Sequence, residues 1–396
     1  MNLKRSSYSL LWLALGVFLI SFNLRTLFTS LSAILPEVIA ATGLSEAQAS
    51  ILTTLPVLCL GIFAIPAPLM ARKFGTEKAL LIALFFIALG TLLRSTPYAF
   101  LLFVGTALAG AGIAVCNVLL PGLIKRDFGT WAAAMTGVFT MGLCLGAAVA
   151  AATTQPVWQS YGESVYIAMA VWTAPAILTT ILWIPETLKQ KKILKGNSIR
   201  PGGLWHDRLA WQVSLFMGLQ SALAYIMMGW LAPMLRDRGM DATSAGYVVA
   251  ISITAQMLAT LVTPSFAVRF RSQSWVAVGL SLLTILSFVA CLALPLTSVW
   301  IWSFLLGIAQ GGTISLAILL IVLRSGEPLI TAQLSGMAQG IGYTIAAAGP
   351  LTVGILKDYS GSFSSSIALI IVIGAIQTIC GYGAGRKLLV SPKIRA

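Results

Sequence analysis

The sequence alternates between long apolar runs and short polar gaps, and this pattern limits the possible folds more than any other feature. A membrane-spanning helix needs roughly 20 apolar residues. Because backbone polar groups in lipid must be hydrogen-bonded within the protein, runs of this length without strand alternation are expected to be helices. The sequence therefore predicts an all-α membrane protein with twelve transmembrane helices, near residues 9–33, 46–70, 77–95, 98–123, 131–154, 163–184, 209–234, 243–268, 274–294, 297–323, 331–356 and 363–386.

The composition excludes most other classes of protein. Hydrophobic residues make up 58% of the chain and charged residues only 9%, whereas soluble domains carry about 25% charged residues. The net charge of +14 arises in the gaps between runs and not on a folded basic face, so nucleic acid is not an expected partner. The five cysteines form no CxxC motif and the chain has a single histidine. We therefore expect no metal, no cofactor and no enzyme activity.

The positions of lysine and arginine predict how the chain is oriented. They are concentrated near both ends of the chain, in the central polar segment and in the loops after even-numbered runs. By the positive-inside rule, both termini and the central segment are expected in the cytoplasm. The first residues resemble a signal peptide, but no small-residue cleavage site follows, so we expect an uncleaved first span.

The chain contains a weak internal repeat. The long polar segment 186–208 separates an N-terminal half (1–185) from a C-terminal half (209–396). PLMARKFG begins at Pro68 and PSFAVRFR at Pro264, and this separation of 196 residues (264 − 68) also holds for Gly43 and Gly239. Two pseudo-symmetric six-helix halves are typical of transporters that alternate around a site near the bilayer midplane. A channel or receptor does not need such a duplication.

Arg25 interrupts the first apolar run. A charge at the bilayer centre costs ~2.5–3.5 kcal/mol on insertion scales, and Arg25 lies too far from either end of the run to snorkel easily. None of the eleven acidic residues lies near the middle of an expected span. An anionic ligand at ~4 Å, with an effective dielectric of ~20, would contribute about 4 kcal/mol. The hypothesis is therefore that Arg25 anchors an anionic or strongly polar substrate.

The neighbours of Arg25 suggest a lining face of the first helix. Phe28 and Thr29 share its side, as do Ser21 and Ser32. Asn23 points about 160° away on an ideal helix. It is therefore expected to orient the helix without touching the substrate.

Further polar residues near the middles of the runs are candidates for substrate binding. Gln339 and Tyr343 share a helix face, Gln220 is followed by Tyr225, and Asn117 and Gln310 complete the set. The alternative for each is a hydrogen bond between helices, worth ~0.6 kcal/mol on average. Small-residue seams at Gly137, Gly142 and Gly146, and at Gly336 and Gly340, predict close helix contacts.

The acidic residues also bear on energy coupling. Proton-driven transporters commonly relay protons through carboxylates inside the membrane, whereas the acidic residues here lie at helix ends or in loops. Glu37, near the end of the first span, is the one that could dip inward. We therefore expect facilitated transport, exchange, or symport in which the proton travels on or near the substrate.

Several stretches resemble the major facilitator superfamily, and more specifically its cyanate/2-nitroimidazole transporter branch of bacterial inner-membrane proteins. They recur in order along most of the chain: NLRTLFTS (23–30), NVLLPGLIKRDF (117–128), GLQSALAY (218–225), WLAP (230–233), GIAQGG (307–312), LRS (323–325) and LSGMAQGIGY followed by AAAGP (334–343, 346–350).

This resemblance implies alternating access around a cavity lined mainly by spans 1, 4, 7 and 10, in a monomer embedded in the lipid bilayer. It carries over Arg25, Asn117, Gln220, Gln310 and Gln339 as candidate site residues. The loops after spans 2 and 8 are expected to gate, through Arg72 and Arg269. In this chain Arg72 stands where the superfamily usually has an acid, so an ion pair built on that acid must be absent or reversed.

Two functions therefore follow as hypotheses. The first is a transporter of a small anionic or strongly polar compound anchored by Arg25. The second is an exporter of neutral nitroimidazole-like heterocycles that stack on aromatic side chains such as Phe28 and Tyr343. The Gly-Pro pair usual in the fifth span of drug–proton antiporters is missing from TGVFTMGLCLGAA (136–148), which disfavours that mechanism.

Overall fold

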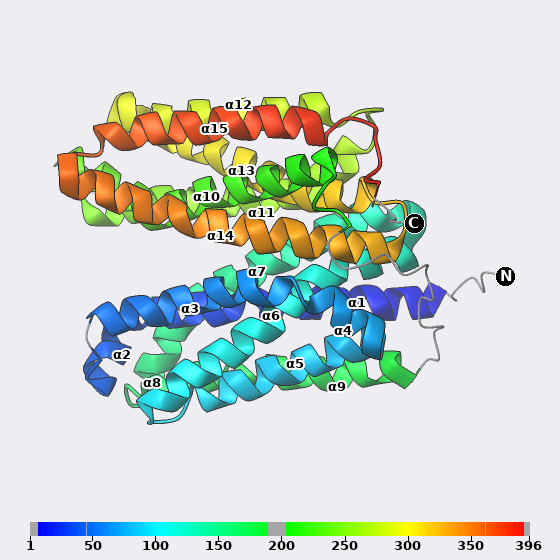
Figure 1. Ribbon diagram of the computed structural model, residues 1–396. Coiled ribbons are helices and arrows are strands. Elements are labelled where there is room, and N and C mark those ends of the chain that lie inside the picture. The colour runs from blue at the N-terminus through cyan, green and yellow to red at the C-terminus, as the bar shows by residue number, and fades with distance from the viewer. Residues whose placement is uncertain (1–6, 45, 189–202, 361, 392–396) are drawn as a thin grey trace. The chain divides into compact units, whose positions relative to one another are not determined.

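A computed structural model of the protein describes residues 7–44, 46–188, 203–360 and 362–391 (Figure 1). Within these ranges the regular structure is helical, with no β-strand. Most of the expected central loop lies outside the described residues, as do Lys4, Arg5, Lys393 and Arg395. The helices are α1 (Ser7–Ala33), α2 (Leu35–Thr42), α3 (Glu46–Ala64), α4 (Ala67–Phe74), α5 (Thr76–Leu93), α6 (Ala99–Phe128), α7 (Ala132–Ser160), α8 (Val165–Ala170), α9 (Thr173–Leu188), α10 (Arg208–Asp237), α11 (Ala242–Ala267), α12 (Ser274–Ala293), α13 (Val299–Leu323), α14 (Pro328–Ser360) and α15 (Ser364–Ala384), with short 3-10 turns at Gly129–Trp131 and Leu296–Ser298.

Two of the expected spans, the second and the sixth, are divided into two helices, whereas the first, 9–33, is one continuous helix followed by a separate short one. After α1, Ile34 leaves helical geometry (φ −128°, ψ 27°) and α2 begins with a proline in its first turn. The second span bends by 55° between α3 and α4, next to Pro66, which has no N–H to continue the ladder. The sixth span is divided into α8 and α9. The sequence predicted the second and sixth spans as single helices, so the boundaries of these two spans are corrected.

The helices are long and apolar enough to cross a membrane. Nine stretches of the described chain meet this condition by length and composition, or ten if the bent α3–α4 pair is one span. One of the nine, 99–160, contains both α6 and α7. With α14, which has 33 residues, the chain has the twelve-helix fold that the apolar runs predict.

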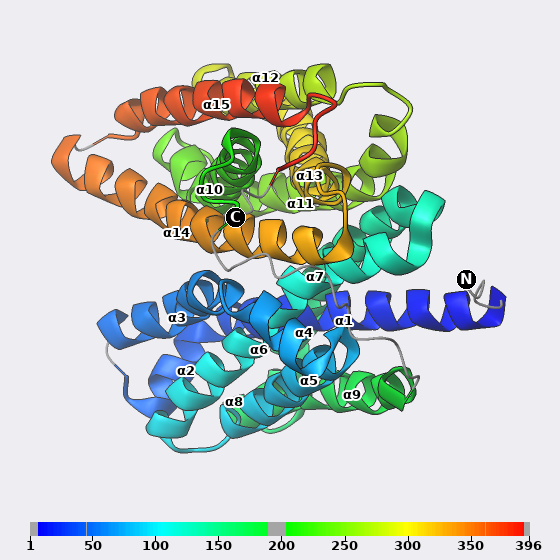
Figure 2. The same ribbon diagram turned by 45° about the vertical axis from the view of Figure 1, so that its right-hand side comes forward.

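The chain divides into two compact units, of which unit 1 comprises residues 1–129 and 142–198, and unit 2 comprises residues 130–141 and 199–396. In unit 1, α3 and α5 pack against α6, and α9 packs against α5 and α1. From Gly142 onward, α7 lies against α1. Figures 1 and 2 show these helices running side by side.

Unit 2 repeats this arrangement. Its α11 and α12 pack against α13, α15 packs against α12 and α10, and α14 packs against α10. Each pair of neighbours corresponds to a pair in unit 1, with α10 in the place of α1 and α13 in the place of α6. The weak sequence repeat therefore corresponds to a repeated helix packing.

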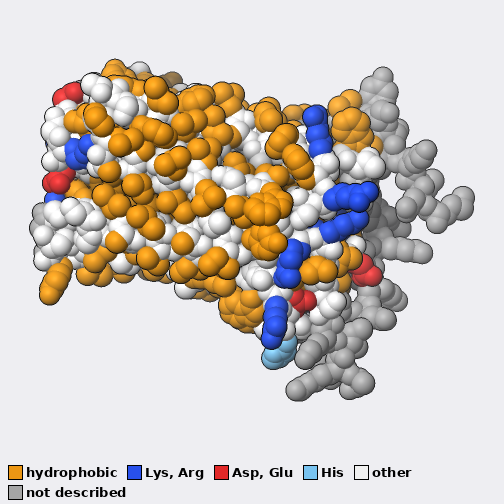
Figure 3. Space-filling model, turned by 90° about the horizontal axis from the view of Figure 1, so that it is seen from above, with side chains coloured by type: hydrophobic (Ala, Val, Ile, Leu, Met, Phe, Trp, Pro, Cys, Tyr) orange, Lys and Arg blue, Asp and Glu red, His pale blue; other side chains and the backbone are white. Residues whose placement is uncertain are grey.

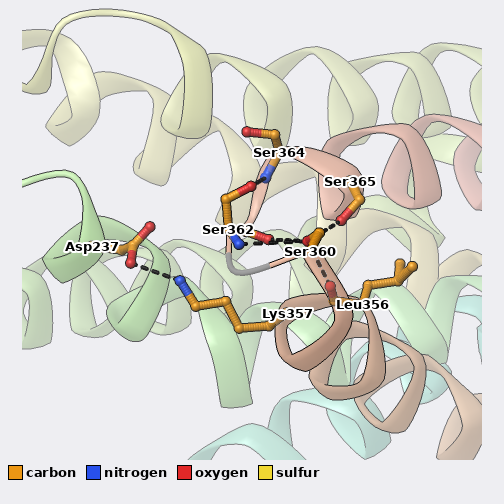
Figure 4. Close-up of polar contacts among 7 residues, drawn as sticks. All are labelled: Asp237, Leu356, Lys357, Ser360, Ser362, Ser364 and Ser365. Atoms are coloured by element: carbon orange, nitrogen blue, oxygen red, sulfur yellow. Dashed lines mark hydrogen bonds and ion pairs between the residues drawn. The ribbon is translucent and has the colours of Figure 1, made fainter.

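Polar contacts gather around the end of α14 in unit 2 (Figure 4). Lys357 forms an ion pair with Asp237 of α10 at 2.8 Å, and its ammonium lies 4.3 Å from the centre of the Phe363 ring. The Ser360 hydroxyl donates to the carbonyls of Leu356 (2.6 Å) and Ser362 (2.8 Å). These contacts tie the end of α14 to α10 and to the start of α15.

Apolar side chains cover much of the surface. Figure 3 shows one face on which hydrophobic groups occupy the middle, whereas lysine and arginine gather toward one end. Helices α12 and α15 contribute exposed Leu282, Leu286, Val372 and Ile379, the last being 72% exposed. Surfaces of this kind are suited to contact with lipid tails.

Candidate functional site

Arg25 lies within α1, more than two turns before the helix ends at Ala33. Its side chain is partly buried, and the guanidinium carbon is 6.0 Å from the centre of the Phe28 ring. Thr29, one turn further, donates its hydroxyl to the Arg25 carbonyl at 3.1 Å. Arg25 and Phe28 thus form a cation–aromatic pair on one side of α1, at the outer limit of such contacts.

The opposite side of α1 is fixed by Asn23. Its amide nitrogen donates to the Leu19 carbonyl at 2.8 Å and to the hydroxyl of Thr179 on α9 at 2.9 Å. Asn23 is only 1% exposed. This agrees with the expectation that Asn23 orients the helix, because its contacts with α9 determine which way the Arg25 side of α1 faces.

Arg94, directly after α5, holds α1 from a second direction. Its two terminal nitrogens donate to the Leu27 carbonyl at 2.8 Å and to the Ser30 hydroxyl at 2.7 Å, and the residue is fully buried. These partners lie more than 60 residues earlier in the chain, and no local pattern in the sequence indicates them.

The glycines of α7 bring that helix close to α1. A Cβ atom at Gly142 would lie 2.0 Å from Oγ of Ser21, and one at Gly146 would lie 2.0 Å from the Phe22 carbonyl oxygen. The predicted close contact is therefore confirmed. Ser21 was expected to share the lining face with Arg25, but it is fully buried and packs against α7 instead.

The other candidate of unit 1 is Asn117. It lies in the middle part of α6 and is 5% exposed. Because α6 packs against α1, the fold places Asn117 on a helix adjacent to the one that carries Arg25.

Gln310 and Gln220 are the buried amides of unit 2. Gln310 on α13 is fully buried, and neither its amide nitrogen nor its oxygen has a hydrogen-bond partner among the described residues. Gln220 on α10 donates to the Met217 carbonyl (3.1 Å) and to the Ser221 hydroxyl (2.7 Å), while its amide oxygen has no partner. Buried polar groups are normally paired, so these amides have free capacity for a polar ligand.

The remaining candidates of unit 2 lie on neighbouring helices. Gln339 on α14 donates to the Ser335 hydroxyl at 2.8 Å and is 3% exposed, and Tyr343, one turn later, is 4% exposed. Tyr225 on α10 is partly buried. Since α10 packs against both α13 and α14, the five candidates of this unit belong to three adjacent helices.

The two expected gating arginines lie at or just after helix ends. Arg72 is partly buried in the last turn of α4, and Arg269 is exposed just after α11.

Two other arginines, which sequence reasoning missed, make several side-chain contacts each. Arg126, near the end of α6, pairs with Glu77 of α5 at 2.5 Å and with Asp127 at 2.7 Å.

Arg324 has the equivalent place in unit 2, just after α13. It donates to the side chain of Gln273 and to the carbonyls of Ala384 and Gly385, both at 2.9 Å. Burial lowers the pKa of the Arg324 guanidinium to about 10, which leaves it charged at neutral pH. Glu77 and Gln273 are 196 positions apart (273 − 77), so the internal repeat itself could have indicated this pair of sites.

Comparison with known proteins agrees with this architecture. Residues 13–354 match the Major Facilitator Superfamily. The chain is 35% identical to the uncharacterized transporter YycB of Bacillus subtilis over 95% of this chain and 94% of that protein. It is 34% identical to the 2-nitroimidazole transporter of Escherichia coli (94% of each chain) and 28% identical to the cyanate transport protein CynX of that organism (87% and 90%).

Solved structures show the same fold. The Escherichia coli fucose:proton symporter FucP superposes with a TM-score of 0.77 at 15% identity, covering 96% of this chain and all of the other. Proteins of this superfamily are transporters that work by alternating access, and not enzymes. The chain therefore belongs to the major facilitator superfamily, in the branch that contains the cyanate and 2-nitroimidazole transporters.

Proposed function

We propose that the protein transports a small anionic or strongly polar compound across the bacterial cytoplasmic membrane by alternating access, with Arg25 as the electrostatic anchor. The observation that carries this proposal is the position of Arg25, which is partly buried within a membrane-spanning helix beside the Phe28 ring. A cation there is costly unless it serves a ligand or a partner, and such residues usually mark substrate pathways.

The other candidate residues have supporting roles in this proposal. Within unit 2, the amide atoms of Gln310 and Gln220 that lack a partner among the described residues can form directional hydrogen bonds with oxygen or nitrogen atoms of a ligand. Asn117, Gln339, Tyr343 and Tyr225 supply further polar contacts. Phe28 and Thr29 shape the surroundings of the guanidinium.

A second candidate function is export of neutral nitroimidazole-like heterocycles. The specific observation in its favour is the 34% identity, over 94% of the chain, to a relative described as a 2-nitroimidazole transporter. In this case Phe28 would stack on the ring of the ligand, and Arg25 would donate to a nitro group or ring nitrogen.

A thermal-shift panel of small organic anions and neutral nitroheterocycles distinguishes the two functions. A ligand at 100 times its Kd stabilises the folded protein by about 2.7 kcal/mol. Loss of a Coulomb energy of about 4 kcal/mol should weaken anion binding by up to ~10³-fold. We expect anions to stabilise the wild type and the control Arg236→Ala, which alters an exposed arginine, but not Arg25→Ala. A verified ligand that binds Arg25→Ala as tightly as it binds wild type would show that Arg25 does not anchor the substrate.

The proposal also includes an orientation and an oligomeric state. The distribution of lysine and arginine favours cytoplasmic termini, and we expect a monomer in the bilayer. Single cysteines at exposed Arg271 and exposed Tyr359 should label from the cytoplasmic side and from the outside, respectively. The opposite pattern would reverse the orientation, and a dimeric mass in nanodiscs would contradict the monomer.

A further inference from the structure

A polar pair lies within unit 1, beyond the end of α1. Glu37 is in the first turn of α2, and Gln155 is near the end of α7. The Gln155 amide nitrogen donates to one Glu37 carboxyl oxygen, Oε1, at 3.0 Å. This contact joins the short helix that continues from α1 to the helix whose glycines pack against α1.

The pair leaves two oxygen atoms unsatisfied. Oε2 of Glu37 and Oε1 of Gln155 are both buried, and neither has a hydrogen-bond partner among the described residues. An ionised carboxylate only accepts hydrogen bonds, and so does an amide oxygen. Because both orphaned atoms are acceptors, rotation of side chains alone cannot pair them with each other.

One added proton can give both of these oxygen atoms a hydrogen-bond partner. A neutral carboxylic acid carries one O–H donor, so an acid and an amide can form two complementary bonds. The amide N–H donates to one acid oxygen, and the acid O–H donates to the amide oxygen. Turning the Gln155 amide over does not remove the need for a proton, because its oxygen would then face Oε1 of Glu37, again two acceptors.

We propose that the Glu37–Gln155 pair is a proton-binding site, in which Glu37 takes up a proton and donates it in a hydrogen bond to the Gln155 amide oxygen. Counting carboxylates at span centres does not reveal this site, because Glu37 lies after the first expected span. Proton binding adds a second bond between α2 and α7, and proton release removes it. The proton therefore controls how firmly the continuation of α1, the helix that carries Arg25, is fastened to α7.

The charged and titratable groups around the pair can be named for the described residues. Helices α3 and α8 pack against α2, and α7 reaches it through Gln155. On α3, α8 and α7 the described titratable side chains are Cys59, Tyr166 and Cys144. The turn after α7 adds Tyr161 and Glu163, and α1 adds Arg25 and the Arg94 that contacts it. Within the described chain, Gln155 is the group that bonds Glu37.

Infrared difference spectroscopy on the purified full-length protein tests this proposal without any substrate, so its outcome is independent of the proposed function. The pH is stepped from about 4, where an ordinary glutamic acid with a pKa of ~4.3 is more than half protonated, to about 9, where it is ionised. We expect a carboxylic-acid C=O band that disappears as the pH rises. This band should be lost in Glu37→Gln and retained in Glu163→Gln, the control, which alters an exposed carboxylate.

A second variant keeps the test decisive if Glu37→Gln does not fold. Gln155→Leu retains the acid but removes both amide bonds, so the band should persist and move to higher frequency. A wild-type band that remains in Glu37→Gln overturns the proposal. So does a band whose frequency Gln155→Leu leaves unchanged, or the absence of any titrating acid band.

Discussion

Gly146 is the position at which packing bears most directly on the proposed anchor. Replacement by alanine would place a Cβ atom 2.0 Å from the carbonyl oxygen of Phe22, 2.8 Å from its carbonyl carbon and 3.1 Å from its Cα. These are backbone atoms of α1, so no side-chain rotation can relieve the clash. Arg25 lies three residues further along the same helix.

The size of the effect follows from these distances. Close carbon–oxygen contacts lie at ~3.3–3.6 Å, so α1 and α7 must separate by about 1.3 Å. Overpacking costs typically ~1–3 kcal/mol, and this overlap with backbone belongs at the upper end of that range. The better helix propensity of alanine returns at most ~1 kcal/mol. We therefore expect a net destabilisation of about 2 kcal/mol.

The same displacement affects an Arg25-bound anion. If the charge separation grows from ~4 Å to ~5.3 Å, the Coulomb energy at a dielectric of ~20 falls from about 4 to about 3 kcal/mol. That difference corresponds to a roughly fivefold loss of affinity. Stability and affinity thus report on the same geometry, and the stability readout does not require that the substrate be known.

Thermal unfolding in detergent measures the stability effect through a thiol-reactive dye, because Cys59, Cys116, Cys291 and Cys380 are buried until the protein unfolds. The matched control is Gly279→Ala on α12, where a Cβ atom meets nothing within 4 Å. We expect the midpoint to fall by several degrees in Gly146→Ala and to stay level or rise in Gly279→Ala. A Gly146→Ala midpoint equal to that of the control would refute the reasoning.

Three further predictions concern contacts within single units. Asn23→Leu removes the amide that reaches Thr179 and should lower stability by ~1–2 kcal/mol; an unchanged unfolding midpoint would show that α9 does not orient α1. Arg126→Ala should destabilise by ~3–5 kcal/mol because it removes the arginine paired with the Glu77 carboxylate, whose side chain is only 10% exposed. Glu77→Gln should cost less, since Asp127 still pairs with Arg126, and equal unfolding midpoints for the two variants would contradict this. Lys357→Met breaks an ion pair whose Asp237 side chain is 44% exposed, so it should lower the free energy of unfolding by at most ~1 kcal/mol. A loss of several kcal/mol in the same thermal assay would show that this pair has a larger structural role.

The sequence alone determined the membrane class, the twelve spans and the duplicated packing. These features depend on local composition and on a repeat that recurs at one spacing. Both can be recognised in the sequence without knowledge of three-dimensional contacts. The position of Arg25 inside a span was legible for the same reason, although its role as an anchor stays a prediction. The helix breaks were harder to predict from the sequence, because prolines also occur within continuous helices of this chain, for example Pro121 in α6.

Only the tertiary structure showed what each polar side chain contacts. Arg94 is buried against the Leu27 carbonyl and the Ser30 hydroxyl of α1, and its sequence neighbours do not indicate these contacts. Gln220 and Gln310 look alike in sequence, but Gln220 has hydrogen-bond partners for its amide nitrogen and Gln310 has none among the described residues. Glu37 gained its significance from Gln155, 118 residues away. The physical reason is that apolar burial is encoded by a local pattern, whereas hydrogen-bond partners depend on which distant helices pack together.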